Sequence, residues 1–275
     1  MPPRLISQRQ VLLGILITGR ENLMLSTAAI ALAGGVAIIV GVLIGAIGIG
    51  GVLLVPMLTY ALGFGIHVAI ATAMFSYLFS GVVGAIEYSR RGSIQWNMGL
   101  WLCLGGMPGA YLGALATWQT PGAVLEGIIG LLVFLSGLQA LRPQSENSGA
   151  ENFLSPVFLL VIGVVTGFAS SITGTGGPLI LVPLLIWLKV PVLTAVGLSQ
   201  IIQIPIALLA TGGNLAFGHI EFGLGLGIAV MLAAGVIVGA RVAHHVSRDT
   251  LKRFIAFALL LVGAAMLIRI VAGIL

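Results

Sequence analysis

The hydrophobic and polar positions divide the chain into long apolar stretches separated by short polar ones. Each apolar stretch approaches the ~20 residues that an α-helix needs to cross the hydrocarbon of a bilayer. None alternates apolar and polar residues at every second position, which excludes the strands of a membrane β-barrel. The pattern therefore predicts an all-α polytopic membrane protein, with spans at about 23–47, 67–86, 97–117, 122–141, 153–172, 191–211, 222–243 and 254–274.

The composition supports this class and limits the possible partners. Hydrophobic residues make up 59% of the 275 residues and charged residues 7%, and the mean hydropathy is +1.19. The net charge of +5 indicates basic loops that face anionic membrane lipid, and we expect no nucleic-acid partner. Before the first span, Arg4 and Arg9 precede a short apolar run without a small-x-small cleavage site, so we expect a retained interfacial helix or a frayed leader there rather than a cleaved signal.

The chain contains an internal repeat with an offset of 126 residues. The segment "GIGGVLLVPML" at 48–58 is similar to "TGGPLILVPLL" at 175–185. Chance would align about two glycine pairs over the repeat. Seven pairs coincide: 41/167, 50/176, 51/177, 92/218, 109/235, 113/239 and 137/263. We therefore expect one transmembrane domain over 1–275, with repeat 1 at about 24–141, a polar linker at 142–152 and repeat 2 at about 153–274.

In each copy a glycine-rich break precedes a short apolar segment, at Val52–Leu62 and at Pro178–Leu188. Eleven helical residues span only about half of a ~30 Å hydrocarbon core, so the lengths of these segments predict half-helices. Basic residues fall in non-equivalent loops of the two copies, for example Arg90 and Arg91 in the first and Arg241 in the second. Because basic loops stay cytoplasmic, this predicts an inverted repeat. Each break is then either the turn of a re-entrant hairpin or a junction between two thin crossings, and both alternatives remain open.

The breaks are the candidate substrate site. The first amides of a helix lack intrahelical partners and carry the positive end of its dipole, and glycine lets an anion touch them. The alternative is that the glycines only allow close helix packing and that the polar side chains only join helices. Buried carboxylates and histidines are scarce, which disfavours a cation-coupled pump, and we expect no cofactor or metal. The candidate substrate-binding residues are Gly50, Gly51, Thr72, Ser76, Thr175, Gly176, Gly177, Ser199, Gln200 and Gln203.

The paired G-x-G-G and proline elements, the helix openings "AIATA" and "AVGLS", and the loops "RGSIQW" and "FGHIEF" resemble the TauE/SafE family of sulfite and organosulfonate exporters over about residues 30–272. This resemblance implies a transporter of the plasma membrane that exports a small sulfur oxyanion without a cofactor. Where the family commonly has a Thr-Ser pair, this chain has Thr72-Ala73 and Leu198-Ser199.

Rival interpretations are a carrier for another small anion or a cation, and a membrane-embedded enzyme. The sequence lacks the H-E-x-x-H and G-x-S-x-G patterns of hydrolases, so we expect no enzymatic activity. The cation carrier would require buried carboxylates, sulfur or histidine clusters. Fold-level analogy suggests a homodimer.

Overall fold

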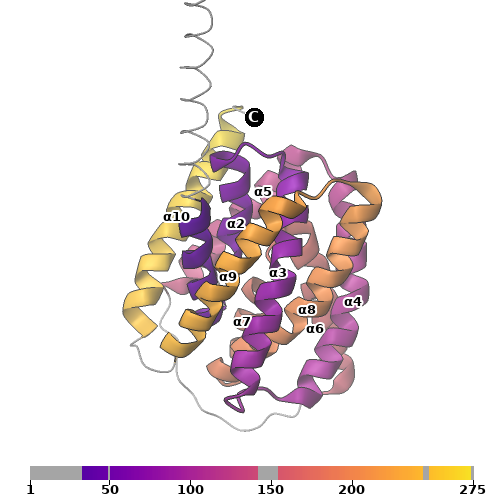
Figure 1. Cartoon of the computed structure of the whole chain (residues 1–275), viewed down its shortest axis with the longest axis vertical. Helices are drawn as coiled ribbons and strands as arrows, with labels where there is room; N and C mark the ends of the chain where they lie inside the picture. The colour runs from indigo at the N-terminus through magenta and orange to yellow at the C-terminus, as the bar shows by residue number, and fades with distance from the viewer. Residues whose placement is uncertain (1–32, 49, 142–153, 244–247, 274–275) are drawn as a thin grey trace, which may run out of the picture.

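The computed structural model describes residues 33–48, 50–141, 154–243 and 248–273, and within these ranges it contains helices and turns but no strand (Figure 1). The prediction of an all-helical membrane protein is thus confirmed. The expected leading segment and the linker at 142–152 lie outside the described residues. In chain order the helices are Ala33–Ile47, Gly51–Ala61 (η1 Gly51–Leu53, α2 Leu54–Pro56 and the π-helical η2 Met57–Ala61), α3 Ile66–Ser89, α4 Trp96–Gln119, α5 Gly122–Ala140, α6 Pro156–Thr173, α7 Pro178–Trp187, α8 Val192–Phe217, α9 Phe222–Val242 and α10 Arg248–Val271.

Six of the described helices are long and apolar enough to cross a membrane: α3, α4, α5, α6, α8 and α9. The described part of the first predicted span covers only Ala33–Ile47, and the apolar part of α10 covers only Leu259–Val271. Large apolar side chains are exposed on the outside of the bundle, among them Val157 (73%), Val230 (60%) and Leu261 (65%). In a membrane protein such side chains face lipid, because hydrocarbon does not oppose their exposure as water does.

Local sequence signals explain where the helices of the second half begin and end. The Ser155 hydroxyl accepts a hydrogen bond from the amide of Phe158 (3.3 Å), and Pro156 occupies the first position of α6, where no amide hydrogen is needed. The helix ends at Gly174, whose φ of 65° is left-handed and favours glycine. This end separates α6 from α7.

Helices far apart in sequence make backbone contact at glycines. The helix Ala33–Ile47 packs on α9, where a methyl group on Gly41 would lie 3.0 Å from Cα of Gly235. In the same way α6 packs along α4, where a methyl group on Gly167 would lie 2.9 Å from the amide nitrogen of Ala110. Side chains larger than hydrogen would separate these helices, so the glycines set their distance.

Two other helix pairs, α5 with α10 and α3 with α8, run antiparallel. Along α5 and α10, Gly127 faces Ile270, Gly130 faces Met266 and Gly137 faces Leu260, so one helix ascends as the other descends. Along α3 and α8, Gly81 contacts Gln203 and Gly84 contacts Gln200, again in opposite order. The pair α3 and α8 forms the centre of the bundle, and α4 and α9 pack against it.

Candidate functional site

The two glycine breaks lie against each other inside the bundle. We call Gly48 together with Gly50 the first break and Gly174–Gly177 the second break. A methyl group on Gly51, directly after the first break, would lie 2.7 Å from the backbone oxygen of Thr175 in the second. The two halves therefore meet at the two places where the chain leaves the helical conformation.

Each break also packs on the short helix of the other half. A methyl group on Gly48 would lie 2.7 Å from Cγ2 of Val182 in α7, and one on Gly174 would lie 2.7 Å from Cγ2 of Val55 in α2. The glycines thus allow the backbone of each half to approach the side chains of the other half closely. The contact between the halves is reciprocal.

The breaks leave buried amide hydrogens without acceptors. In the second break Gly176 and Gly177 have φ values of 79° and 114°, which turn the chain so that α7 begins at Pro178. Within the described residues, the amides of Gly176, Gly177, Leu179, Gly50 and Gly51 have no hydrogen-bond acceptor. All five residues are buried, and buried donors are normally paired. Unpaired amides and, in the second break, the positive end of the α7 dipole are the kind of donors that bind an anion.

Tyr77 of α3 stands between the two breaks and is fully buried. Its hydroxyl donates to the backbone oxygen of Gly51, and its ring covers the second break, with Cδ2 2.9 Å from the place of a methyl group on Gly176. The backbone oxygen of Tyr77 accepts from Nε2 of Gln203 (2.9 Å), which also donates to Oγ of Ser80 (2.9 Å). One side chain thus contacts both halves of the candidate site.

The structure brings several of the predicted side chains to this region. Ser199 donates to the backbone oxygen of Val196 (2.7 Å), and its Oγ lies 3.6 Å from the place of a methyl group on Gly48. The hydroxyl of Thr175 is 3.1 Å from that of Thr173. Gln200 donates to the backbone oxygen of Ile44 (3.4 Å) in the helix before the first break, and its Oε1 has no partner.

Thr72 and Ser76 are placed differently, against α9. Ser76 donates to the backbone oxygens of Thr72 (2.9 Å) and Gly225 (2.8 Å). The Thr72 hydroxyl accepts from the amide of Glu221 (3.2 Å) at the beginning of α9. The structure brings these two residues together but joins them to α9, and it shows no hydrogen bond between them and the breaks.

Sequence reasoning missed two features of the region. Tyr77 occupies the position equivalent to Gln203 under the 126-residue offset, and that equivalence was the signal that could have identified it. The other feature is a group of buried hydroxyls without partners on α6, one to two turns before the second break. They belong to Thr166, Ser170 and Ser171.

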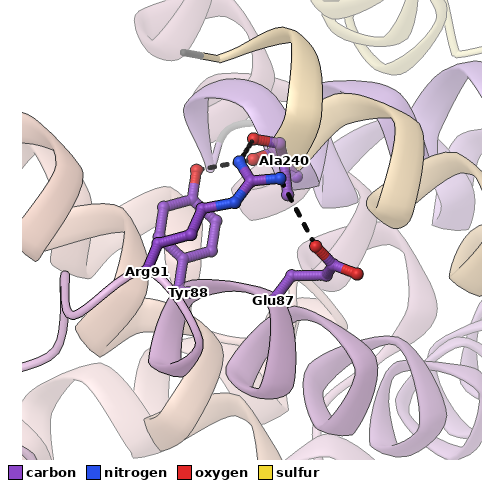
Figure 2. Close-up of polar contacts among 5 residues, drawn as sticks. Glu87, Tyr88, Arg91 and Ala240 are labelled. Atoms are coloured by element: carbon purple, nitrogen blue, oxygen red, sulfur yellow. Dashed lines mark hydrogen bonds and ion pairs between the residues drawn. The ribbon is translucent and has the colours of Figure 1, made fainter.

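A separate polar cluster closes one end of α3 (Figure 2). The guanidinium of Arg91 donates to the backbone oxygen of Ala240 in the last turn of α9 and lies 3.4 Å from the carboxylate of Glu87. The hydroxyl of Tyr88 donates to the backbone oxygen of Gly45 (2.7 Å). A cation near carbonyls at a helix C-terminus is favourable, so this cluster fixes α3 against α9 and Ala33–Ile47.

The polar side chains that are buried in the described part of the chain are all neutral, among them Thr175, Ser199 and Gln203. The described residues bring no three His, Cys, Asp or Glu side chains together as a metal site. The chemistry available at the breaks is therefore hydrogen bonding from amides, hydroxyls and carboxamides.

Six of the described helices are long and apolar enough to cross a membrane, and the comparisons with known proteins define the class as a multi-pass membrane transporter. The family described as Sulfite exporter TauE/SafE matches residues 32–266, and the chain belongs to that family. This confirms the resemblance seen in the sequence and places the protein in the plasma membrane.

The chain is similar to proteins named as probable membrane transporters. It is 27% identical to YdhB of Bacillus subtilis over 83% of this chain and 96% of that protein. It is 24% identical to MJ0441 of Methanocaldococcus jannaschii over 85% and 93%, and 30% identical to a protein of Xylella fastidiosa over 58% and 64%. No solved structure matches the chain.

Proposed function

We propose that this transporter exports a small sulfur oxyanion, such as sulfite, sulfoacetate or a related organosulfonate. The observation that carries the proposal is the meeting of the two glycine breaks, with unpaired buried amides on Gly50, Gly51, Gly176 and Gly177. Donors without accompanying acidic groups favour an anion over a cation. Neutral donors also bind less tightly than a buried lysine or arginine, which allows release.

We further propose that the two copies form an inverted repeat with glycine-broken half-helices. Under the 126-residue offset, α5 corresponds to α10 and α3 to α8, and both pairs are antiparallel, which supports a two-fold axis in the membrane plane. The contact of Ala33–Ile47 with α9 likewise corresponds to the contact of α6 with α4. The ten residues of α7 span about 15 Å, half of the hydrocarbon core. The repeats then extend over about 24–141 and 153–274.

In this proposal the break amides hold the oxyanion near the two-fold axis. The side chains of Thr175, Ser199, Gln200 and Gln203 line the same region. The hydroxyls of Thr72 and Ser76 contribute indirectly, because their hydrogen bonds fix α3 against α9.

The membrane potential supports export. In a cell with a negative interior, each negative charge that leaves gains about 2.3 kcal/mol per 100 mV. A doubly charged oxyanion therefore has a driving force without a coupling ion. Fold-level analogy extends the proposal to a homodimer, which native mass spectrometry of the purified protein tests.

The test of the proposed substrate is flux into and out of proteoliposomes that contain the purified protein, with sulfite, sulfoacetate, sulfate, chloride and a monovalent cation compared. We expect saturable flux of sulfite and sulfoacetate that Gly176→Leu and Gln203→Ala abolish or strongly reduce. Gly212→Leu is the matched control, because no other group lies within 4 Å of a methyl group on Gly212. Flux of the cation alone, or anion flux that survives both site substitutions in folded protein, would contradict the proposal.

A further inference from the structure

Tyr77 is the one described side chain that hydrogen-bonds to the backbone of one half at its break and covers the break of the other half with its ring. It lies in the middle of α3, on the helix pair that forms the centre of the bundle. A methyl group on Gly51 would be 3.3 Å from the Tyr77 hydroxyl oxygen, and the ring lies against Gly176. The phenol therefore adjoins two of the glycines whose amides are unpaired.

The chemistry of this position favours an exchange of hydrogen-bond partners. A phenol hydroxyl donates one hydrogen bond, and in the structure the Gly51 backbone oxygen takes it. An oxyanion held by the amides of Gly51 and Gly176 would lie next to the same hydroxyl. A hydrogen bond to an ionised acceptor is roughly twice as strong as one between neutral groups. The anion therefore replaces the Gly51 backbone oxygen as the acceptor of the phenol hydrogen bond.

We infer that Tyr77 is a substrate-binding residue, whose hydroxyl turns from the Gly51 carbonyl to the anion when the site is occupied. The inference rests on the proposed function and adds to it a specific side-chain ligand that the sequence did not identify. The bond from Gln203 to the backbone oxygen of Tyr77 holds the helix in place, so that the phenol can turn without a movement of α3.

The equivalent position of the other copy does not duplicate this role. Gln203 corresponds to Tyr77 under the 126-residue offset, but its Nε2 group donates to Tyr77 and Ser80 of α3, whereas the Tyr77 hydroxyl donates to the backbone beside a break. The site is therefore asymmetric at its centre, with the phenol as the donor that can change partner.

Tyr88→Phe provides a matched control for Tyr77→Phe. Tyr88 is also fully buried in α3, and its hydroxyl also donates to a backbone oxygen of the first half, that of Gly45. Both substitutions remove one hydroxyl and keep the ring. Only Tyr77 adjoins the unpaired amides of the breaks.

The experiment measures sulfite and sulfoacetate flux in proteoliposomes against substrate concentration. For Tyr77→Phe we expect a rise in KM of about ten- to a hundredfold, which corresponds to the loss of one hydrogen bond to a charged group, with the maximal rate much less affected. For Tyr88→Phe we expect an unchanged KM. A KM for Tyr77→Phe within about threefold of the wild type, or an equal rise in both variants, overturns the inference. Wild-type protein that transports neither anion overturns the proposed function and the inference together.

A second measurement uses the wild-type protein and does not depend on how the variants fold. The chain has four tyrosines, so ring-labelled tyrosine gives a simple NMR spectrum. Titration with sulfite should shift the Tyr77 Cζ resonance and leave that of Tyr88 in place. A Tyr77 resonance that does not move at saturating sulfite contradicts the inference.

Discussion

Gly51→Ala tests the contact between the two breaks. The added methyl group would lie 2.7 Å from the backbone oxygen of Thr175, whereas ordinary contacts begin at about 3.4 Å, so the breaks must separate by about 0.7 Å. The oxygen belongs to the backbone and cannot rotate away. Overpacking of this kind costs about 1–3 kcal/mol of the free energy of unfolding. The displacement also moves the Gly51 amide and the carbonyl that binds Tyr77.

The assay for Gly51→Ala combines thermal unfolding in detergent with anion flux in proteoliposomes. We expect a lower unfolding temperature and a rise in KM for sulfite of about tenfold, the effect of about 1.4 kcal/mol of lost binding free energy. Gly65→Ala is the control, because its φ of −58° suits alanine and no other group lies within 4 Å of the added methyl. If Gly51→Ala matched Gly65→Ala in both stability and KM, the reasoning about the two breaks would be refuted.

Two further predictions concern helix packing and are checked by thermal unfolding in detergent. Gly109 and Gly235 are equivalent in the repeat, and a methyl group on either would collide with the backbone of the facing helix. We expect Gly109→Ala and Gly235→Ala each to lower the free energy of unfolding by at least about 2 kcal/mol. Gly227→Ala is the control: its methyl group has open space, and we expect it to raise the free energy of unfolding by up to about 1 kcal/mol. Equal stabilities of the three variants would contradict the packing. Arg91→Ala removes the donor to the end of α9 and should lower the free energy of unfolding by about 1–2 kcal/mol. Glu87→Gln weakens only a partly exposed ion pair and should lower it by less than about 0.5 kcal/mol. A larger loss for Glu87→Gln than for Arg91→Ala would contradict this order.

The sequence predicted the helices of this protein well because a bilayer imposes their length and polarity. The predicted short segments, Val52–Leu62 and Pro178–Leu188, lie within one residue of the helices at Gly51–Ala61 and Pro178–Trp187. The second break consists largely of glycines with positive φ. Glycine is a poor helix former, so a cluster of glycines inside an apolar run can be recognised in the sequence. The backbone part of the candidate site was therefore accessible to sequence reasoning.

The side-chain part was not accessible to the same degree. Helical periodicity relates residues of one helix to each other but does not say which neighbouring helix a face meets. Thr72 and Ser76 were selected as polar residues of α3, yet they face α9, while Tyr77, one residue further, faces the breaks. An aromatic residue inside a membrane helix looks like core, and apart from its equivalence with Gln203 in the repeat only the tertiary contact with Gly51 distinguishes Tyr77.

Binding of an oxyanion by the paired breaks can be observed in an anomalous-scattering experiment. Selenite has the shape and charge of sulfite, and its selenium atom can be located in crystals of the protein soaked with the salt. We expect an anomalous peak within hydrogen-bond reach of the amides of Gly51, Gly176 and Gly177, next to the Tyr77 hydroxyl. Selenium bound elsewhere in the bundle, with these amides unoccupied at a concentration that saturates transport, would contradict it.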